Sequence, residues 1–167
     1  MIYEEYIKNN TDTFKAKVKQ ICSALGIDPD WLMTVMYAES RVNPAAYNAT
    51  SGASGLIQFM PSTAQWLGTT TAALRSMTNV AQLDYVYLYF KNLGVSGKMK
   101  SVYDLYLATF FPAALGKADT WVMQTSSLSA QTIAAQNQII DLNKDGQITV
   151  GEFKEYVAGY LKKKTLL

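Results

Sequence analysis

The sequence predicts an all-α fold, from its apolar periodicity and its helix start and stop signals. Apolar residues recur at helical spacing in most segments of the 167-residue chain. Gly26 closes the first such segment, and Asp28-Pro29 opens the next as an N-cap followed by proline at the first helical position. The threonines at 69–71 are predicted to form a loop rather than a strand, because no nearby segment could pair with them. The hydrophobic content of 49% is ordinary for a globular protein.

The expected helices follow one another along the chain. The first begins near Asp12 and has an apolar face formed by Phe14, Val18, Ile21, Cys22 and Leu25. The single cysteine, Cys22, is therefore expected to be a small core residue. Ser101 and Asp104 have the spacing of a capping box variant, which favours helix capping over catalysis for Asp104. The remaining helices are predicted from residue 29 towards Asn43-Pro44, over 61–67 and 79–92, around Tyr106, and over 129–140 and 152–163.

Glu39 is the candidate catalytic residue. Leu32, Val35, Met36 and Glu39 recur at i, i+3, i+4 and i+7, so Glu39 is in line with an apolar stripe. Burial and the partial negative charge of a helix C-terminus both disfavour a carboxylate, so both are expected to raise its pKa. A raised pKa suits a carboxyl group that donates a proton near neutrality. Considered alone, Glu39 would be interpreted as an exposed residue on a frayed last turn. The residues that follow it in the sequence favour a catalytic role instead.

Those neighbours form a motif over residues 37–61, YAESRVNPAAYNATSGASGLIQFMP. Glu39-Ser40, Asn43-Pro44 and a glycine-rich turn precede Leu56-Ile57-Gln58-Phe59-Met60-Pro61-Ser62-Thr63-Ala64. This order closely resembles the signature of the soluble lytic transglycosylases, glycoside hydrolase family 23. The family pattern is E-S-x-x-N-P, a short loop, then G-A-x-G-L-M-Q-x-M-P-x-T-A. Here Ile57 replaces the usual methionine, and the loop after Pro44 is one residue longer.

The resemblance implies a lysozyme-like fold and assigns candidate site residues. Glu39 would be the catalytic acid/base, and Gln58 would line the sugar cleft, with Ser40 beside Glu39 as a further substrate-binding candidate. The serine that precedes the family's glycine turn falls opposite Asn48 or Ser51, and both remain candidates.

Tyrosines supply the remaining cleft candidates. The segment TNVAQLDYVYLYF resembles the third family motif, and its alternating Tyr85, Tyr87 and Tyr89 cannot all face one way on a helix. Tyr87 is expected to pack inward, with the other two partly exposed, and any of them could contact sugar. The family's A-Y-N-A-G motif is replaced by LATFFPAA at residues 107–114, a form that resembles phage-associated members. Tyr103 and Tyr106 are candidates for the missing tyrosine that would bond to Glu39.

The resemblance implies cleavage of peptidoglycan between N-acetylmuramic acid and N-acetylglucosamine. Glu39 would protonate the glycosidic oxygen and then deprotonate the muramoyl C6 hydroxyl, which closes a 1,6-anhydro ring. No second carboxylate is required, and Asp84, Asp104 and Asp119 are not flanked by family-like residues. One alternative is a goose-type lysozyme that uses water. Another is a non-catalytic module, a wall-binding or calcium-regulated structural protein.

A calcium-binding segment is predicted near the C-terminus. Residues 141–152, DLNKDGQITVGE, fit the EF-hand loop at each diagnostic position. The expected ligands are Asp141, Asn143, Asp145, the Gln147 carbonyl, Thr149 and Glu152, with Gly146 at the sharp turn. The predicted organisation is a lysozyme-like domain over 1–128 and an EF-hand-like segment over 129–167 packed on it or on another chain. Calcium is not needed for the chemistry.

Composition excludes several other functions. No histidine is present, which excludes His-based triads and His-ligated zinc. The net charge of +2 is too small to indicate nucleic-acid binding. No run reaches the roughly 18 apolar residues of a membrane span, and Met1–Glu5 lacks signal-peptide character. An enzyme of the bacterial wall is then expected to arrive with phage virion components or at lysis, although a missing prepeptide would explain this equally well.

Overall fold

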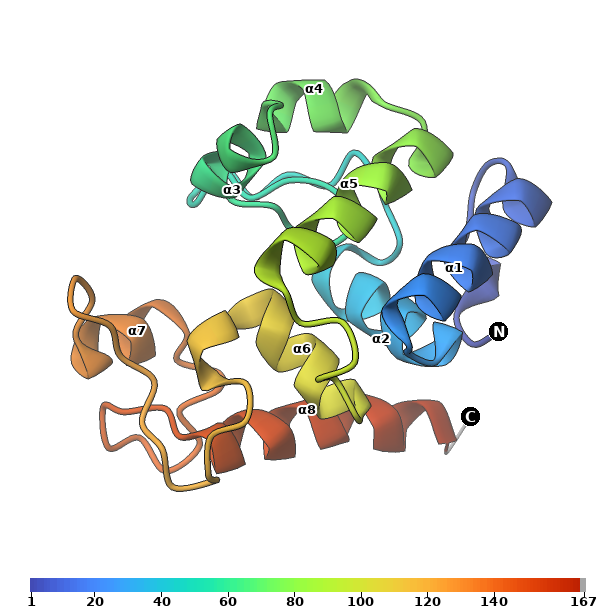
Figure 1. The fold of residues 1–167 in the computed structure, drawn as a ribbon. Helices are drawn as coiled ribbons and strands as arrows, with labels where there is room; N and C mark the ends of the chain where they lie inside the picture. Colours follow the sequence, from blue (N-terminus) through green and yellow to red (C-terminus); the bar gives the residue numbers. More distant parts are fainter. Residues whose placement is uncertain (166–167) are drawn as a thin grey trace. The chain divides into compact units, whose positions relative to one another are not determined.

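The computed structural model describes the backbone of residues 1–165 and the side chains up to Leu161 (Figure 1). It is 55% helical, and the described residues contain no strand beyond isolated bridges. The all-α prediction is therefore confirmed. The helices are η1 (Glu4–Tyr6), α1 (Thr11–Leu25), α2 (Pro29–Ser40), α3 (Pro61–Trp66), α4 (Thr71–Ser76), α5 (Asn79–Leu93), α6 (Val102–Phe110), η2 (Pro112–Ala114), α7 (Ala130–Gln136) and α8 (Val150–Thr165).

The chain forms two compact units, Met1–Leu105 and Tyr106–Leu167. Helix α6 begins in the first unit and ends in the second. The predicted functional division was placed at residue 128. By packing, residues 106–128 belong to the same compact unit as the calcium-loop segment, and the functional division stays a prediction.

In the first unit, α1 packs against α2 and α5, and α3 packs against α4 (Figure 1). The buried residues of α1 are the five that its periodicity predicted, and Cys22 is fully buried. Burial, with a smaller contribution from Asp28, raises the pKa of the Cys22 thiol to about 12. Asp28 caps α2 as predicted, because its carboxylate accepts the Asp30 amide at 2.8 Å. Cys22 is thus an unreactive core residue.

Helix α4 was not predicted. Thr70 is its N-cap, with the hydroxyl accepting the Ala73 amide at 3.0 Å, so the threonine run starts a helix rather than forming only a loop. Only Leu74 of this six-residue helix is buried. A single apolar position gives no periodicity to detect.

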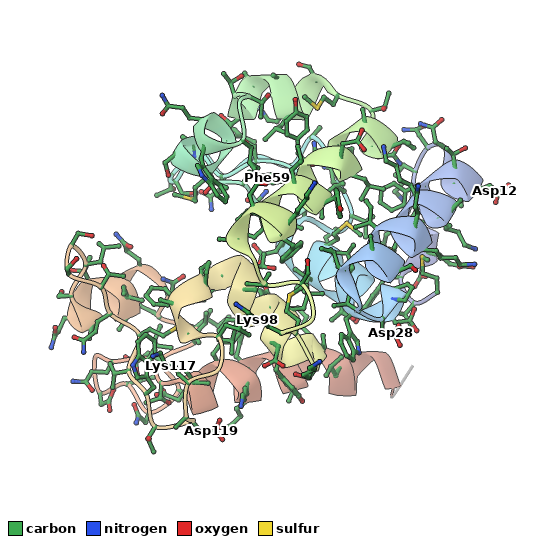
Figure 2. The ribbon with its side chains drawn as sticks, in the orientation of Figure 1. Asp12, Asp28, Phe59, Lys98, Lys117 and Asp119 are labelled. Atoms are coloured by element: carbon green, nitrogen blue, oxygen red, sulfur yellow. The ribbon has the colours of Figure 1, made fainter. Side chains whose placement is uncertain are left out.

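The expected orientation of the tyrosines on α5 was wrong. Tyr89 is the buried one, with its ring edge-on to Phe59 and Phe90, whereas Tyr85 and Tyr87 are half-buried. The burial of Tyr89 raises its pKa. Figure 2 shows Phe59 beside α5. The buried face is formed by Asn79, Gln82, Leu83, Val86, Tyr89 and Phe90. This face includes the polar residues Asn79 and Gln82, which apolar periodicity does not place in a core.

The second unit has an aromatic core. The Phe153 ring on α8 lies edge-on to Tyr106 at 5.2 Å and stacks on Phe110 at 5.0 Å. Ser129 caps α7, which ends at Gln136, so the helix predicted over 129–140 is shorter and continues as turns. Helix α8 begins at Val150, two residues earlier than predicted. Asp119, labelled in Figure 2, forms an ion pair with Lys154 of α8 at 2.8 Å.

Candidate active site

Glu39 lies on the last turn of α2, where a buried stripe reaches the surface. Leu32, Val35 and Met36 are completely buried, and Glu39 is half-buried. Met33 and Thr34 are buried as well, so this part of α2 is buried on all sides and Glu39 lies where the burial ends. The carboxyl group combines an apolar support with access to solvent.

The chain leaves α2 through two consecutive left-handed residues, Arg41 (φ 57°) and Val42 (φ 59°). The Arg41 amide donates to the Tyr37 carbonyl at 2.9 Å, and the Val42 amide donates to the Met36 carbonyl at 3.1 Å. A β-branched residue at positive φ is a genuine outlier, and such strain concentrates at functional sites. No glycine at residues 41–42 marks this turn in the sequence.

Ser40 links the end of α2 to the glycine-rich loop. Its hydroxyl lies 2.9 Å from the carbonyl oxygens of both Met36 and Leu56, and it accepts the Asn43 amide at 3.2 Å. The side chain is buried. In this structure Ser40 holds the loop in place, and the expected contact with substrate stays a prediction.

The loop itself is tied by backbone hydrogen bonds. Ser54 and Phe59 exchange amide–carbonyl bonds of 3.0 and 2.8 Å, and the Gly55 amide donates to the Ala46 carbonyl at 2.8 Å. Isolated bridges pair Ser54 with both Tyr47 and Phe59. These contacts make the segment between α2 and α3 a defined platform rather than a loose connection.

Gln82 of α5 stabilises this platform through hydrogen bonds to its backbone. The sequence analysis did not assign this role. The side-chain oxygen of Gln82 accepts the Leu56 amide at 2.6 Å, and its nitrogen donates to the carbonyls of Pro44 at 2.9 Å and Leu74 at 2.7 Å. The side chain is completely buried. A Cβ on Gly55, which has φ 84°, would collide with Gln82, so glycine is required there. The only signal in the sequence was a polar residue in an apolar helix.

A shallow depression of about 480 Å³ lies over Glu39. Gln58 lines it in a left-handed conformation (φ 56°), with its side-chain nitrogen donating to the Gly55 carbonyl at 3.2 Å. Asn48 also lines it, and its side-chain oxygen accepts the amides of Thr50 and Ser51. The lining is formed by Ala38, Glu39, Ser40, Arg41, Ala46, Tyr47, Asn48 and Gln58.

The structure thus brings together Glu39, Ser40, Asn48 and Gln58. Ser51 is not part of this lining, and its hydroxyl accepts the Ala53 amide at 3.2 Å. Tyr87 lies on α5 with the Lys91 ammonium 5.8 Å from its ring centroid. Tyr106 belongs to the second unit and is buried against Phe153. Tyr47 lines the depression and was not among the predicted site residues.

Glu39 is the single carboxylate in the lining of this depression. Asp84 is exposed and pairs with Lys17 at 2.8 Å. Asp104 accepts the Lys100 amide at 2.8 Å, and its own amide donates to the Ser101 hydroxyl at 3.2 Å. The predicted capping role of Asp104 is therefore confirmed. A second depression, of about 310 Å³, is lined by Lys8, Asn9, Asn10, Val42, Pro44, Met77, Thr78 and Asn79 and contains no acid.

The predicted calcium loop, residues 141–152, is closed by its own carboxylates. Asp141 accepts the amides of Asp145 and Gly146 at 3.2 and 3.0 Å, and Asp145 accepts the Gln147 amide at 2.9 Å. Gly146 has φ 82°, as a sharp turn requires. Within the described part of the chain, no three or more Asp, Glu, Cys or His side chains are gathered as a ready metal-binding group.

Thr149 and Glu152 form a capping box at the start of α8. The Glu152 amide donates to the Thr149 hydroxyl at 3.2 Å, and a Glu152 oxygen accepts the Thr149 amide at 3.2 Å. The other Glu152 oxygen accepts the Leu142 amide at 2.9 Å. Glu152 therefore joins the first and last parts of the loop.

The loop also pairs with a segment outside it, residues 121–123. The Met123 amide donates to the Ile148 carbonyl at 2.8 Å, and the Val150 amide donates to the Trp121 carbonyl at 3.0 Å. Val122 and Thr149 form an antiparallel bridge. The segment that pairs with the loop, residues 121–123, therefore belongs to the same compact unit as the loop itself.

Comparison with known proteins gives a match to one family model, which covers less than half of the chain. Residues 17–84 match the model of the family described as "Transglycosylase SLT domain". The matched range contains Glu39, Asn48, Gln58 and Gln82 and ends before Tyr87. No curated protein matches the chain. Across the described residues, no helix has both the length and the apolar character needed to span a membrane.

This match supports the resemblance of the chain to the lytic transglycosylases and to lysozyme-like proteins. It indicates an enzyme of the lytic transglycosylase type that degrades peptidoglycan, and the all-α structure is consistent with that fold.

Proposed function

We propose that this protein cleaves the β-1,4 bond between N-acetylmuramic acid and N-acetylglucosamine of peptidoglycan by lytic transglycosylation, with Glu39 as the catalytic residue. The observation that carries the proposal is the single carboxylate in the depression at the end of α2. The family match over residues 17–84 supports the substrate class.

The mechanism follows from that single carboxylate. Glycosidases that use two carboxyl groups place them roughly 5 to 9.5 Å apart across the scissile bond. Here Glu39 would donate its proton to the glycosidic oxygen while the bond from that oxygen to the muramoyl C1 breaks. The muramoyl C6 hydroxyl then attacks C1, and the Glu39 carboxylate takes the hydroxyl proton. The catalyst regains its starting protonation state, and the product carries a 1,6-anhydro ring.

Gln58 and Asn48 act in this proposal as substrate-positioning residues. Both line the depression. In each, one atom of the side-chain amide group already forms a hydrogen bond with the loop backbone. A primary amide has two donor hydrogens and an acceptor oxygen, so each retains hydrogen-bonding capacity for sugar hydroxyl and acetamido groups. Ser40, Ser51, Tyr87 and Tyr106 remain further substrate-binding candidates.

The test of Glu39 is its replacement by glutamine, which keeps the size of the side chain and removes the transferable proton. General acid–base catalysis contributes about 10²- to 10⁴-fold, so Glu39→Gln should reduce muropeptide release at least about 100-fold. Circular dichroism should be unchanged, because Glu39 is half-buried on the surface end of α2.

The matched control is Gln58→Asn. Residue 58 has positive φ, which asparagine tolerates, so the backbone should keep its conformation while the amide is withdrawn. The loss of turnover should be clearly smaller than for Glu39→Gln, because Gln58 moves no proton. A Glu39→Gln protein that keeps most of its activity would remove Glu39 from the mechanism.

Hydrolysis in the manner of goose-type lysozyme is the alternative for the same site, with water in place of the C6 hydroxyl. A non-catalytic wall-binding or calcium-regulated module is the third candidate. The two enzymes differ in product and the module releases nothing, so one product analysis separates all three.

We also propose that residues 141–152 bind calcium. The oxygens expected at the ligand positions come from Asp141, Asn143, Asp145, the Gln147 carbonyl, Thr149 and Glu152. The carboxylates of Asp141, Asp145 and Glu152 accept amides within the loop. Each carboxylate has about four lone-pair positions, so lone pairs remain on each for a hard cation. Calcium would stabilise the second unit and takes no part in the chemistry at Glu39.

The proposed place of action is the bacterial cell wall. Delivery with phage virion components, or release at lysis, is supported only by the resemblance of residues 107–114 to phage-associated members of the family. Mass spectrometry of purified particles from a producing culture separates the two routes. Recovery of the protein in particles supports the first, and recovery only in the lysate supports the second.

A further inference from the structure

Tyr47 is a large aromatic residue on the wall of the Glu39 depression. Its side chain is 57% exposed, although it belongs to a loop that is otherwise tightly hydrogen-bonded. The backbone holds Tyr47 in place through an antiparallel bridge to Ser54. The ring therefore projects into solvent from a fixed point beside the catalytic candidate.

Arg75 of α4 holds the ring from one side. Its guanidinium carbon lies 4.3 Å from the centroid of the Tyr47 ring. An Arg75 Nη donates to the Ser54 hydroxyl at 2.6 Å, and Ser54 is completely buried. Ser54 in turn donates to the Gly52 carbonyl at 3.0 Å. Both the tyrosine and the arginine are thus anchored to the same buried serine.

This arrangement gives an oriented aromatic surface. Cation–π contact with Arg75 occupies one face of the ring, while Tyr47 as a whole stays 57% exposed and lines the depression. A ring that is already oriented loses little conformational freedom when a ligand stacks on it, so more of the contact energy appears as affinity. The C–H face of a pyranose ring is a flat, weakly polar surface that suits such stacking.

We propose that Tyr47 is a sugar-stacking residue for the glycan strand and that Arg75 is its positioning residue. This inference rests on the proposed function for the substrate class, a β-1,4-linked strand of N-acetylated hexosamines. The proposed contact is made with the sugar ring alone. It therefore does not require the lactyl group or the peptide stem of peptidoglycan. A soluble oligomer of β-1,4-linked N-acetylglucosamine is therefore a sufficient probe.

The first experiment measures binding of that oligomer by calorimetry in the Glu39→Gln background, which prevents turnover. Adding Tyr47→Ala should weaken binding about ten-fold, the size of an aromatic stacking contact. Tyr47→Phe and Tyr47→Trp should stay within about two-fold of the parent, because both keep a flat ring. In the enzyme with Glu39 intact, Tyr47→Ala should raise KM for soluble glycan strands and leave kcat within about two-fold.

The matched control is Trp66→Ala. Trp66 on α3 is 52% exposed, similar to Tyr47, but it does not line the depression. Its loss should leave oligomer binding unchanged. Equal losses for Tyr47→Ala and Trp66→Ala, or a Tyr47→Ala affinity within two-fold of the parent, would overturn the proposal.

Arg75 is tested by a double-mutant cycle. Arg75→Met removes the charge and the bond to Ser54, and should weaken binding a few-fold when Tyr47 is present. In the Tyr47→Ala background the same change should have almost no effect, because there is no ring left to orient. If the losses of affinity from Arg75→Met and Tyr47→Ala are additive, the positioning role of Arg75 is contradicted. Thermal melting of each variant shows whether a loss of affinity comes from partial unfolding.

The outcome is distinguishable from that of the proposed function. Absence of muropeptide release by the unmodified protein counts against catalysis, while the calorimetric comparison still tests the stacking. Failure of the Glu39→Gln parent to bind the oligomer at millimolar concentration would overturn the stacking proposal for this sugar class.

Discussion

Among the residues that form the site, some have roles that the sequence predicts and others have roles that only the structure shows. Glu39, Asn48 and Gln58 belong to one continuous motif, and the structure gathers all three at one depression. Gln82 and Arg75 act from α5 and α4 on a loop far from them in the chain. No local pattern encodes such contacts, because they exist only once three segments have packed together.

Gln82 gives the residue-scale prediction for stability. Gln82→Leu would keep the volume but leave the Leu56 amide and the carbonyls of Pro44 and Leu74 without their partner. Each buried polar group left unpaired costs about 1–3 kcal/mol, so the free energy of unfolding should fall by at least about 2 kcal/mol. Urea denaturation measures this fall, and muropeptide release at low temperature should fall as well because the loop loses its anchor.

The control for Gln82→Leu is Gln65→Leu on α3. Gln65 is exposed, so the same change of residue type should alter the free energy of unfolding by no more than about 0.5 kcal/mol. Equal effects of the two substitutions would show that Gln82 does not support the loop.

At the scale of elements, predictions succeeded where caps and periodicity agree over several turns. Helix α1 buries the face that its periodicity predicted and ends at Gly26, and α2 begins after its predicted N-cap, Asp28. Helix α4 was missed because only Leu74 is buried, and α2 stops at Ser40, before Asn43-Pro44, because Arg41 and Val42 turn left-handed. The face of α5 was misjudged because a fully satisfied Gln82 occupies a core position.

Calcium is predicted to stabilise the loop formed by residues 141–152. Asp141, Asp145 and Glu152 belong to one short loop, and a bound cation would offset their negative charges. A ligand bound only by the folded state stabilises it by about 2.7 kcal/mol at a hundred-fold excess over its Kd. Calcium should therefore raise the melting temperature, and Glu152→Gln should reduce that gain. Differential scanning calorimetry with calcium and with chelator measures both.

Glu155→Gln on α8 is the control for Glu152→Gln. Glu155 is exposed and lies outside the loop, so this substitution should leave the calcium-dependent gain intact. Peptidoglycan cleavage at low temperature should persist in chelator, since the chemistry at Glu39 uses no metal. An unchanged melting temperature would count against the site, whereas loss of activity in a still-folded protein would make calcium a switch.

For the molecule as a whole, the helical class was predictable from the sequence, whereas the packing of residues 106–128 with the calcium loop was not. Helical periodicity is local, so it is visible in sequence. The grouping of residues 106–128 with the calcium loop depends on long-range contacts, such as the pairing of Trp121 and Met123 with the loop backbone. This pairing also explains how a single loop of the EF-hand pattern can be stabilised without a second one beside it.

In the proposed mechanism one carboxylate suffices, because the substrate supplies its own nucleophile. Mass spectrometry of muropeptides released from purified peptidoglycan by the unmodified protein tests it most directly. The predicted products carry 1,6-anhydromuramoyl ends, lighter by one water than the corresponding hydrolysis products, and incorporate no label from ¹⁸O-water. Reducing ends that carry the ¹⁸O label would contradict the claim and assign the site to hydrolysis, and no released muropeptide at all would leave only the non-catalytic module.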